Sequence, residues 1–196
     1  MKVWKHIAIP LLGLFLAFQL GFASDVGKFE YRVLATKKTS TMQKELNEAG
    51  TDGFRFEGVM GGSTGFSGSE AVVVMSRDRT ATKHPRLEYK LLATSKTSTM
   101  QKEMQQAADE GFRYKGQTVF ESAFGGKEVV TVMERDREGK AERHDYQLLA
   151  SSKTSTMQKE LQEAAEAGFQ FVGLSVAETG LGGKELVVIV RRESAE

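Results

Sequence analysis

The octapeptide Lys-Thr-Ser-Thr-Met-Gln-Lys-Glu occurs three times in this chain, at Lys38–Glu45, Lys96–Glu103 and Lys153–Glu160. The copies start 58 and 57 residues apart, so one unit is written three times. This period lies just above the roughly 20–50 residues typical of solenoid repeats. It therefore predicts three small, complete units rather than thin stacked turns.

A segment of alternating residues precedes each octapeptide and predicts a first strand. The three segments are Glu30–Thr36, Glu88–Thr94 and Asp145–Ser151. The octapeptide itself predicts the start of a helix, because Ser40 is followed three residues later by Gln43, as in a capping box. Apolar residues recur behind it at helical spacing. A glycine then follows at Gly53, Gly111 and Gly168, which suits a left-handed C-terminal cap.

Two more strands complete each unit. The second strands are expected at Phe54–Gly58, Phe112–Gly116 and Phe169–Gly173, and the third at Ala71–Met75, Val129–Met133 and Leu186–Val190. Hairpin loops are expected between them, at Val59–Ser69, Gln117–Lys127 and Leu174–Lys184. The third strand is apolar at nearly every position, which is typical of a central strand covered on both faces.

The predicted fold is therefore α+β, with three tandem β-α-β-β repeats that contain nine strands and three helices. Each helix is long enough for a crossover, and the second and third strands form a hairpin. We expect antiparallel sheets in the order 1-3-2 with the helices on one face. The opposite sheet face keeps apolar residues such as Leu34, so it needs a cover. We expect the three units to supply it to one another by packing around a pseudo-threefold axis.

The chain divides into a leader, three repeats and two linkers. Residues 1–23 form the predicted signal peptide, followed by repeat 1 at 29–79, a linker at 80–86, repeat 2 at 87–137, a linker at 138–143 and repeat 3 at 144–192. The leader has a basic start, an apolar run over Ile7–Leu20 and small residues before a cut after Ala23. An uncleaved N-terminal anchor is the alternative. Cleavage predicts an exported protein, periplasmic or secreted, with no integral membrane segment left.

Composition excludes several classes of function. The formal net charge is +1, and loss of Lys2 and Lys5 with the leader leaves 25 basic and 26 acidic side chains, so we expect no nucleic-acid partner. The chain has no cysteine, which excludes disulfides, thiol catalysis and thiolate metal sites. We expect no cofactor and no metal site. An envelope component or a second copy of the chain is the partner that we consider.

The octapeptide is identical in all three copies, beyond what capping and packing require. A helix N-terminus with free N–H groups, hydroxyls and a lysine is suited to binding anions. The hypothesis is an anion site at each helix start, and the alternative is a good cap in a recently duplicated segment. The candidate residues are Lys38, Thr39, Ser40, Lys96, Thr97, Ser98, Lys153, Thr154 and Ser155.

Other motifs favour structural roles. The sequence has no G-x-x-x-x-G-K-[ST] loop, so nucleotide-loop chemistry is excluded. His84 and His144 occupy unrelated positions and are interpreted as surface residues. The recurring acids are interpreted as surface carboxylates; they are Glu45, Glu103, Glu160, Glu70, Glu128 and Glu185. Units closed around an axis would let the recurring tyrosines, beginning with Tyr31, line a pocket for a flat ligand.

The order of these signals resembles a known bacterial family. Glu30-Tyr31, Gly53-Phe54, the apolar strand Val72–Met75 and the closing Arg77, with their counterparts in the other copies, resemble the small β-α-β-β family catalogued as domain of unknown function 4177. The resemblance implies the fold and no activity. This chain departs from the family in having phenylalanine where tryptophan usually follows the glycine.

We therefore expect an exported, non-catalytic binding or structural protein. The alternative is a protein that binds a small ligand or an anion, through the three helix N-termini or a pocket between the repeats. An enzyme ranks third, because no pattern in the sequence assembles a nucleophile or an acid–base pair.

Overall fold

The computed structural model describes residues 27–64, 68–94, 96–121, 127–140, 142–178 and 184–194, so the predicted signal peptide at residues 1–23 lies outside the described residues. The elements follow one another as β1 (Phe29–Thr36), α1 (Thr39–Thr51), β2 (Arg55–Thr64), β3 (Gly68–Asp78), β4 (Leu87–Thr94), α2 (Thr97–Asp109), β5 (Arg113–Glu121), β6 (Lys127–Asp136), β7 (His144–Ser151), α3 (Thr154–Glu166), β8 (Gln170–Glu178) and β9 (Lys184–Glu193).

Each repeat forms one antiparallel sheet whose third strand is central. The strand orders are β1-β3-β2, β4-β6-β5 and β7-β9-β8, which confirms the predicted α+β fold of three β-α-β-β units. The register also repeats, because Val33 pairs with Val74, Leu91 with Val132 and Leu148 with Ile189. Equivalent residues of the three repeats can therefore be compared directly.

The hairpin strands are longer than the sequence predicted. β2 continues to Thr64 and β3 begins at Gly68, so most of the segment expected to be a loop is paired backbone. The other two hairpins behave in the same way. Antiparallel pairing continues through the glycine-rich and polar residues because the ladder bonds come from the main chain. A β-bulge interrupts each hairpin, between Phe56 and Gly58 in repeat 1.

The helix ends were predicted correctly at one terminus and wrongly at the other. Gly53 has φ +85°, and the N–H groups of Gly53 and Phe54 donate to carbonyls of the last helical turn, as in a Schellman motif. The predicted capping box is wrong. The N-cap is Lys38 and no side chain caps α1, so Ser40 lies inside the first turn. The Thr36 hydroxyl instead accepts the Lys38 N–H at 3.2 Å.

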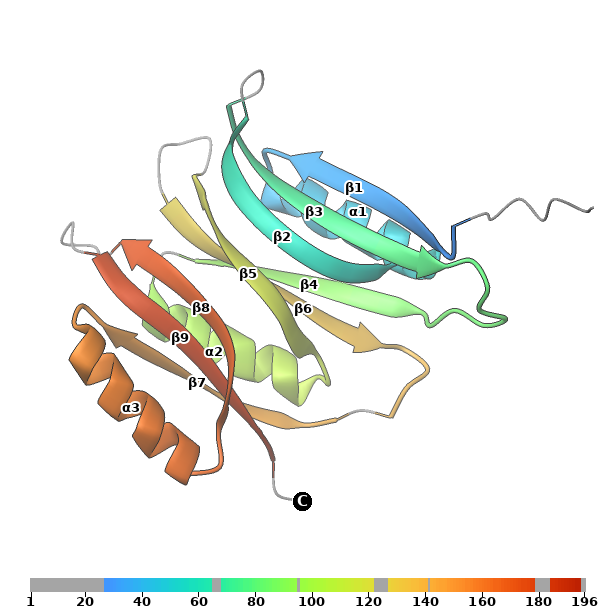
Figure 1. Ribbon diagram of the computed structural model, residues 1–196. Helices are drawn as coiled ribbons and strands as arrows, with labels where there is room; N and C mark the ends of the chain where they lie inside the picture. Colours follow the sequence, from blue (N-terminus) through green and yellow to red (C-terminus); the bar gives the residue numbers. More distant parts are fainter. Residues whose placement is uncertain are drawn as a thin grey trace, which may run out of the picture.

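The three repeats form an open row in which sheet and helix layers alternate (Figure 1). α1 packs between its own sheet and the sheet of repeat 2, because its core contains Leu34 and Met75 from one side and Tyr89 and Val132 from the other. α2 packs between the second and third sheets in the same way.

The predicted pseudo-threefold arrangement is wrong. Among the described residues, extensive contacts join repeat 1 to repeat 2 and repeat 2 to repeat 3, and no helix or strand of repeat 1 packs extensively on repeat 3. The physical reason is that each repeat uses one surface toward its predecessor and a different surface toward its successor. Successive repeats are therefore related by a step along a row, and the two end surfaces stay apart.

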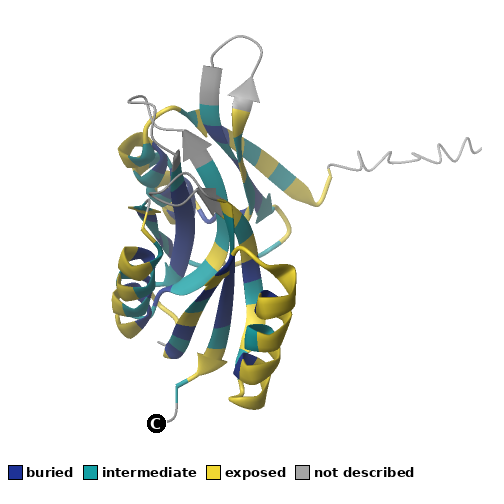
Figure 2. Cartoon of the chain, turned by 90° about the vertical axis from the view of Figure 1, so that its left-hand side faces the viewer, coloured by how far each residue is buried: buried dark blue, intermediate teal, exposed yellow. Residues whose placement is uncertain are grey.

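The core is weakest at the C-terminal end of the row. The third cluster consists only of residues of repeat 3, with Leu149, Met157 and Val188 among them, because no further sheet among the described residues covers α3. α3 is mostly exposed in Figure 2, whereas the middle of the central strand β9 on which it packs is buried.

Candidate functional site

The most regular polar feature of the molecule is an arginine at the end of the third strand of each repeat. Its guanidinium forms an ion pair with the acid that is the second residue of the first strand. The pairs are Arg77 with Glu30 at 2.7 Å, Arg135 with Glu88 at 2.8 Å and Arg192 with Asp145 at 3.0 Å. The bond from Arg77 holds the pKa of Glu30 below its usual range.

The same guanidinium also closes the end of the helix. Arg77 donates to the carbonyl of Asp52 at 2.9 Å and lies 4.6 Å from the ring centre of Phe54. Arg135 and Arg192 repeat both contacts with the helix end and the phenylalanine of their own repeats. The recurring acid, glycine-phenylalanine and arginine therefore form one clamp that fixes the helix C-terminus on the sheet. Cation–π and charge-assisted contacts supply its strength.

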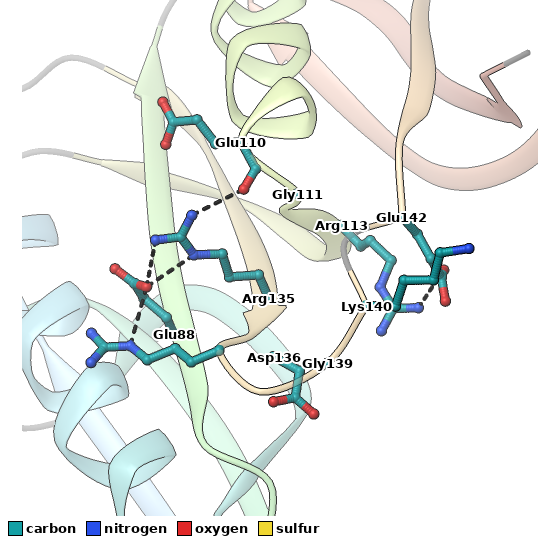
Figure 3. Close-up of a pocket in the computed structure, with 10 residues that line it drawn as sticks. Glu88, Glu110, Gly111, Arg113, Arg135, Asp136, Gly139, Lys140 and Glu142 are labelled. Atoms are coloured by element: carbon teal, nitrogen blue, oxygen red, sulfur yellow. Dashed lines mark hydrogen bonds and ion pairs between the residues drawn. The ribbon is translucent and has the colours of Figure 1, made fainter. Parts of the chain in front are cut away.

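A charged pocket of about 420 Å³ lies beside the clamp of repeat 2. Figure 3 shows Arg113, Lys140 and Glu142 on one side of it and Glu88 and Arg135 on the other. The charged groups pair with one another, because Arg113 contacts Glu142 at 2.8 Å and Arg137 contacts Glu88 at 3.2 Å. Burial raises the pKa of Glu88, but the bonds from Arg135 and Arg137 outweigh it and leave the pKa lowered.

The equivalent position differs in the other two repeats. Repeat 3 has a pocket of about 450 Å³ lined by Gly168, Gln170 and Arg192 together with other charged residues. In repeat 1 the side chain of His84 lies against Gly53, so the linker fills this position. The pocket is thus a consequence of how the linkers run. Its glycine and clamp arginine recur in repeat 3, whereas the linker residues that line it in repeat 2 do not.

The sequence-predicted anion sites lie on three separate helices. Lys38, Lys96 and Lys153 are exposed, as are Ser40, Ser98 and Ser155, and no side chain of these residues caps its helix. Thr39 and Thr97 are half-buried, whereas Thr154 is exposed. The helix N-termini all point toward the left-hand end of the molecule in Figure 1. A crevice of about 10 Å³ at the start of α1 has room for one water at most.

The octapeptide glutamine has a role that the sequence did not reveal. The Leu91 N–H donates to Gln43 at 3.0 Å, and Asn47 forms a pair of hydrogen bonds with the N–H and carbonyl of Tyr89, at 2.9 and 3.0 Å. Two side-chain amides of α1 therefore bind the free backbone edge of β4 in the next repeat.

The second junction repeats this arrangement. Gln101 bonds the Leu148 N–H and the Tyr146 carbonyl, both at 2.6 Å, and the Tyr146 N–H donates to Gln105 at 3.0 Å. One signal could have found the role, namely that amide side chains recur one helical turn apart at Gln43 and Asn47, Gln101 and Gln105, and Gln158 and Gln162. We call this amide pair and the strand edge that it binds the amide joint.

Two of the recurring tyrosines, Tyr89 and Tyr146, belong to the same joints, whereas Tyr31 is exposed on the outer face of the first sheet. The three do not line a common pocket, so the predicted flat-ligand pocket is wrong. The hydroxyl of Tyr89 accepts the Phe56 N–H at 3.0 Å, at the β-bulge of the preceding repeat, and donates to Glu134 at 2.7 Å. The Tyr146 hydroxyl accepts the Tyr114 N–H at 2.8 Å. Burial and the Glu134 charge raise the pKa of Tyr89 far above its usual value.

The histidines differ from expectation at one position. His84 lies in the linker, as predicted, whereas His144 is buried, and its Nδ1 has no hydrogen-bond partner. Burial, reinforced by Arg191, lowers the pKa of His144. No group of three or more histidine, aspartate or glutamate side chains in the described residues could hold a metal ion. Within the same residues, no helix is both long and apolar enough to cross a membrane.

Comparison with family models, curated proteins and solved structures finds no match to this chain. The resemblance to domain of unknown function 4177 therefore stays a prediction.

Proposed function

We propose that this is an exported, non-catalytic binding or structural protein whose three repeats build one continuous layered array. The observation that supports it best is that the recurring polar residues serve the fold and the joints. The clamp arginines bind acids and helix ends, and the octapeptide glutamines Gln43 and Gln101 bind the next repeat.

The polar clusters give further support to a non-catalytic role. A general acid or base needs a group held ready to exchange a proton with a substrate. The carboxylates of the clamps are instead paired with arginine. The buried Glu134 binds Tyr89 and lies 3.4 Å from Lys115, but Ser76 and Arg191 replace it in the other repeats, so the cluster does not recur.

Two measurements on the purified protein test this proposal. A thermal-shift screen against anions, nucleotides, flavins and glycans identifies ligands that stabilise the folded state. A panel of chromogenic esters, phosphates and glycosides measures turnover, and we expect none above the uncatalysed rate. Turnover that disappears in Glu134→Gln would replace the proposal with an enzyme. Export is tested by N-terminal sequencing of the processed protein, which should begin at Ser24.

Anion binding at the helix N-termini is a second candidate, favoured by one observation. The lysine and serine side chains of the octapeptide are exposed and cap no helix, so the fold does not account for their identity in all three copies. Phosphate and a polyanion such as heparin are suitable probes.

A triple substitution tests this second candidate. Replacing Lys38, Lys96 and Lys153 by alanine should abolish binding of the anion. The matched control replaces the other three octapeptide lysines, Lys44, Lys102 and Lys159, and removes the same charge from the same helices. Equal binding by both triple variants would exclude a site at the helix N-termini.

A further inference from the structure

Both ends of the array expose a surface that the inner repeats bury. At the N-terminal end, the outer face of the first sheet is uncovered, and we call it the head face; it carries Phe29, Tyr31, Val33, Met60 and Val74. At the C-terminal end, α3 and the adjoining side of β8 are uncovered, and we call this surface the tail face; it carries Gln158, Gln162, Phe171, Leu174 and Val176.

The head face is the uncovered equivalent of two buried surfaces. Tyr31 is 65% exposed, whereas its equivalents Tyr89 and Tyr146 are 1% and 3% exposed. Val74 is exposed, whereas Val132 and Ile189 are fully buried. Isolated exposed apolar residues are normal, but a contiguous patch of them marks an interaction surface. In repeats 2 and 3 the partner of this surface is the helix and second strand of the preceding repeat.

The tail face carries the other half of the same joint. Gln158 and Gln162 are exposed, whereas the equivalent amides of α1 and α2 bind a strand edge. Phe171 is 59% exposed, whereas its equivalent Phe56 is buried. Among the described residues, every large apolar side chain that is exposed belongs to the head face or the tail face.

The glycines show how closely the equivalents of the two faces pack in the two joints within the chain. In the first joint, a Cβ on Gly116 would lie 3.0 Å from the ring of Phe56, and in the second joint a Cβ on Gly173 would clash with the hydroxyl of Tyr114. Gly58 is the equivalent glycine of the head face, and nothing lies within 4 Å of its Cβ position. The aromatic ring that would cover it is that of Phe171 in another molecule.

We propose that a second copy of the chain docks its tail face on the head face and continues the row of layers from molecule to molecule. This inference rests on the proposed structural function and names its partner. Gln158 and Gln162 of one copy bind the free edge of β1 of the next, Phe171 covers Gly58, and Tyr31 enters the position that Tyr89 and Tyr146 occupy within the chain. The contact joins two different surfaces, so it leaves an open end on each side and supports growth into filaments.

Two single substitutions test the proposal, each on one face. Val33→Lys places a charge on the head face, and Phe171→Lys places one on the tail face. Both residues are more than half exposed, so the monomer fold should survive. Gln106→Lys adds the same charge to the exposed side of α2 and serves as the control. Protein produced from the full-length sequence is studied by sedimentation velocity and light scattering over a wide concentration range.

The expected mass of the unmodified protein and of the Gln106→Lys control rises with concentration through whole multiples of the monomer. Each single-face variant alone should stay monomeric. Their mixture should form a dimer and stop there, because the intact tail of Val33→Lys meets the intact head of Phe171→Lys.

Three results would overturn the proposal. One is a monomer at every concentration. The occupant of the head face would then be the N-terminal segment or a different protein. Another is a dimer formed by one variant alone, which indicates contact between like faces. The third is a mixture that stays monomeric. None of these results bears on the absence of turnover, so self-association can fail while the non-catalytic function stands, and the reverse also holds.

Discussion

At the scale of the residue, neighbours along the row decide the environment of a side chain. The tyrosine of the first strand is the same in all three repeats, yet its hydroxyl accepts a backbone N–H only where a repeat precedes it. Burial raises the pKa of Tyr114, another joint tyrosine, to about 12. The first-strand tyrosines Tyr31, Tyr89 and Tyr146 therefore allow the effect of burial to be measured on the same type of side chain.

Removal of the tyrosine hydroxyl should lower the stability of the fold at Tyr89 and leave it nearly unchanged at Tyr31. Tyr89→Phe leaves the Phe56 N–H without its side-chain acceptor and the buried Glu134 carboxylate with Lys115 but no hydroxyl donor. This change should lower the free energy of unfolding by about 1–3 kcal/mol. Tyr31→Phe should change it by less than about 0.5 kcal/mol. Urea denaturation of dilute protein, where separate copies stay apart, measures both. Equal losses would contradict the role assigned to the joint hydroxyl.

His144 should make the second joint sensitive to acid. Burial and Arg191 lower its pKa, so the unfolded chain binds the proton more readily than the folded chain. The stabilisation is present above the ordinary histidine pKa of about 6.5 and is lost as the pH falls below it. His144→Leu introduces the residue found at the equivalent position, Leu87, and should retain more stability between neutral and mildly acidic pH. Parallel pH profiles of the two proteins would show that His144 does not titrate on unfolding.

At the scale of the element, each inner helix holds its own sheet on one side and the next sheet on the other. Its apolar residues fill the layer between the two sheets, and its amides satisfy the outer edge of the next first strand. An edge strand with unpaired backbone groups is a site of association. The amide joint covers this edge in β4 and β7, whereas no element in the described part of the chain supplies equivalent amides to β1.

The octapeptide glutamine gives a matched test of the joint. Gln101→Ala removes both bonds to β7 and leaves the Leu148 N–H and the Tyr146 carbonyl unpaired at a partly buried edge. The expected loss of unfolding free energy is about 1–3 kcal/mol. Gln158→Ala changes the same residue in the same octapeptide on the exposed α3, and should cost less than about 0.5 kcal/mol in dilute protein. Equal costs would mean that the glutamines act within their own helices.

The sequence predicted the elements well because their signals are local. Alternation identified the first strands, and the glycines with φ near +85° identified the helix ends. The serine and glutamine of the octapeptide also matched a local motif, but the glutamine binds a strand some 48 residues away. The hairpins were predicted too short for a similar reason, because main-chain pairing leaves no pattern in glycine-rich segments. Interactions between repeats were therefore missed where they used residues that a local motif already explained.

At the scale of the whole molecule, the repeats form a row with two unlike ends. Solenoid proteins commonly end in capping repeats with polar outer faces. Here the first sheet presents Tyr31, Val33 and Val74 to solvent, and the last helix presents its joint amides. The inner surfaces of the row are therefore covered, whereas the head face and the tail face are exposed. These two faces are the equivalents of surfaces that pack on each other within the chain.

A cross-link between the two faces tests this account most directly. The chain has no cysteine, so introduced thiols meet no competitor. In the first joint, a Cβ on Gly116 would lie 3.6 Å from Cγ1 of Val59, which is close enough for a disulfide after small adjustment. The equivalent positions at the two ends are Gly58 and Leu174. The measurement is the yield of disulfide dimer in an oxidised equimolar mixture of Gly58→Cys and Leu174→Cys.

The account predicts that the mixture gives a disulfide dimer containing one copy of each variant, and that each variant alone gives little disulfide dimer, because its single thiol then meets a residue that is not cysteine. A dominant disulfide between two copies of Gly58→Cys, or no dimer at protein concentrations where the unmodified chain associates, would contradict it.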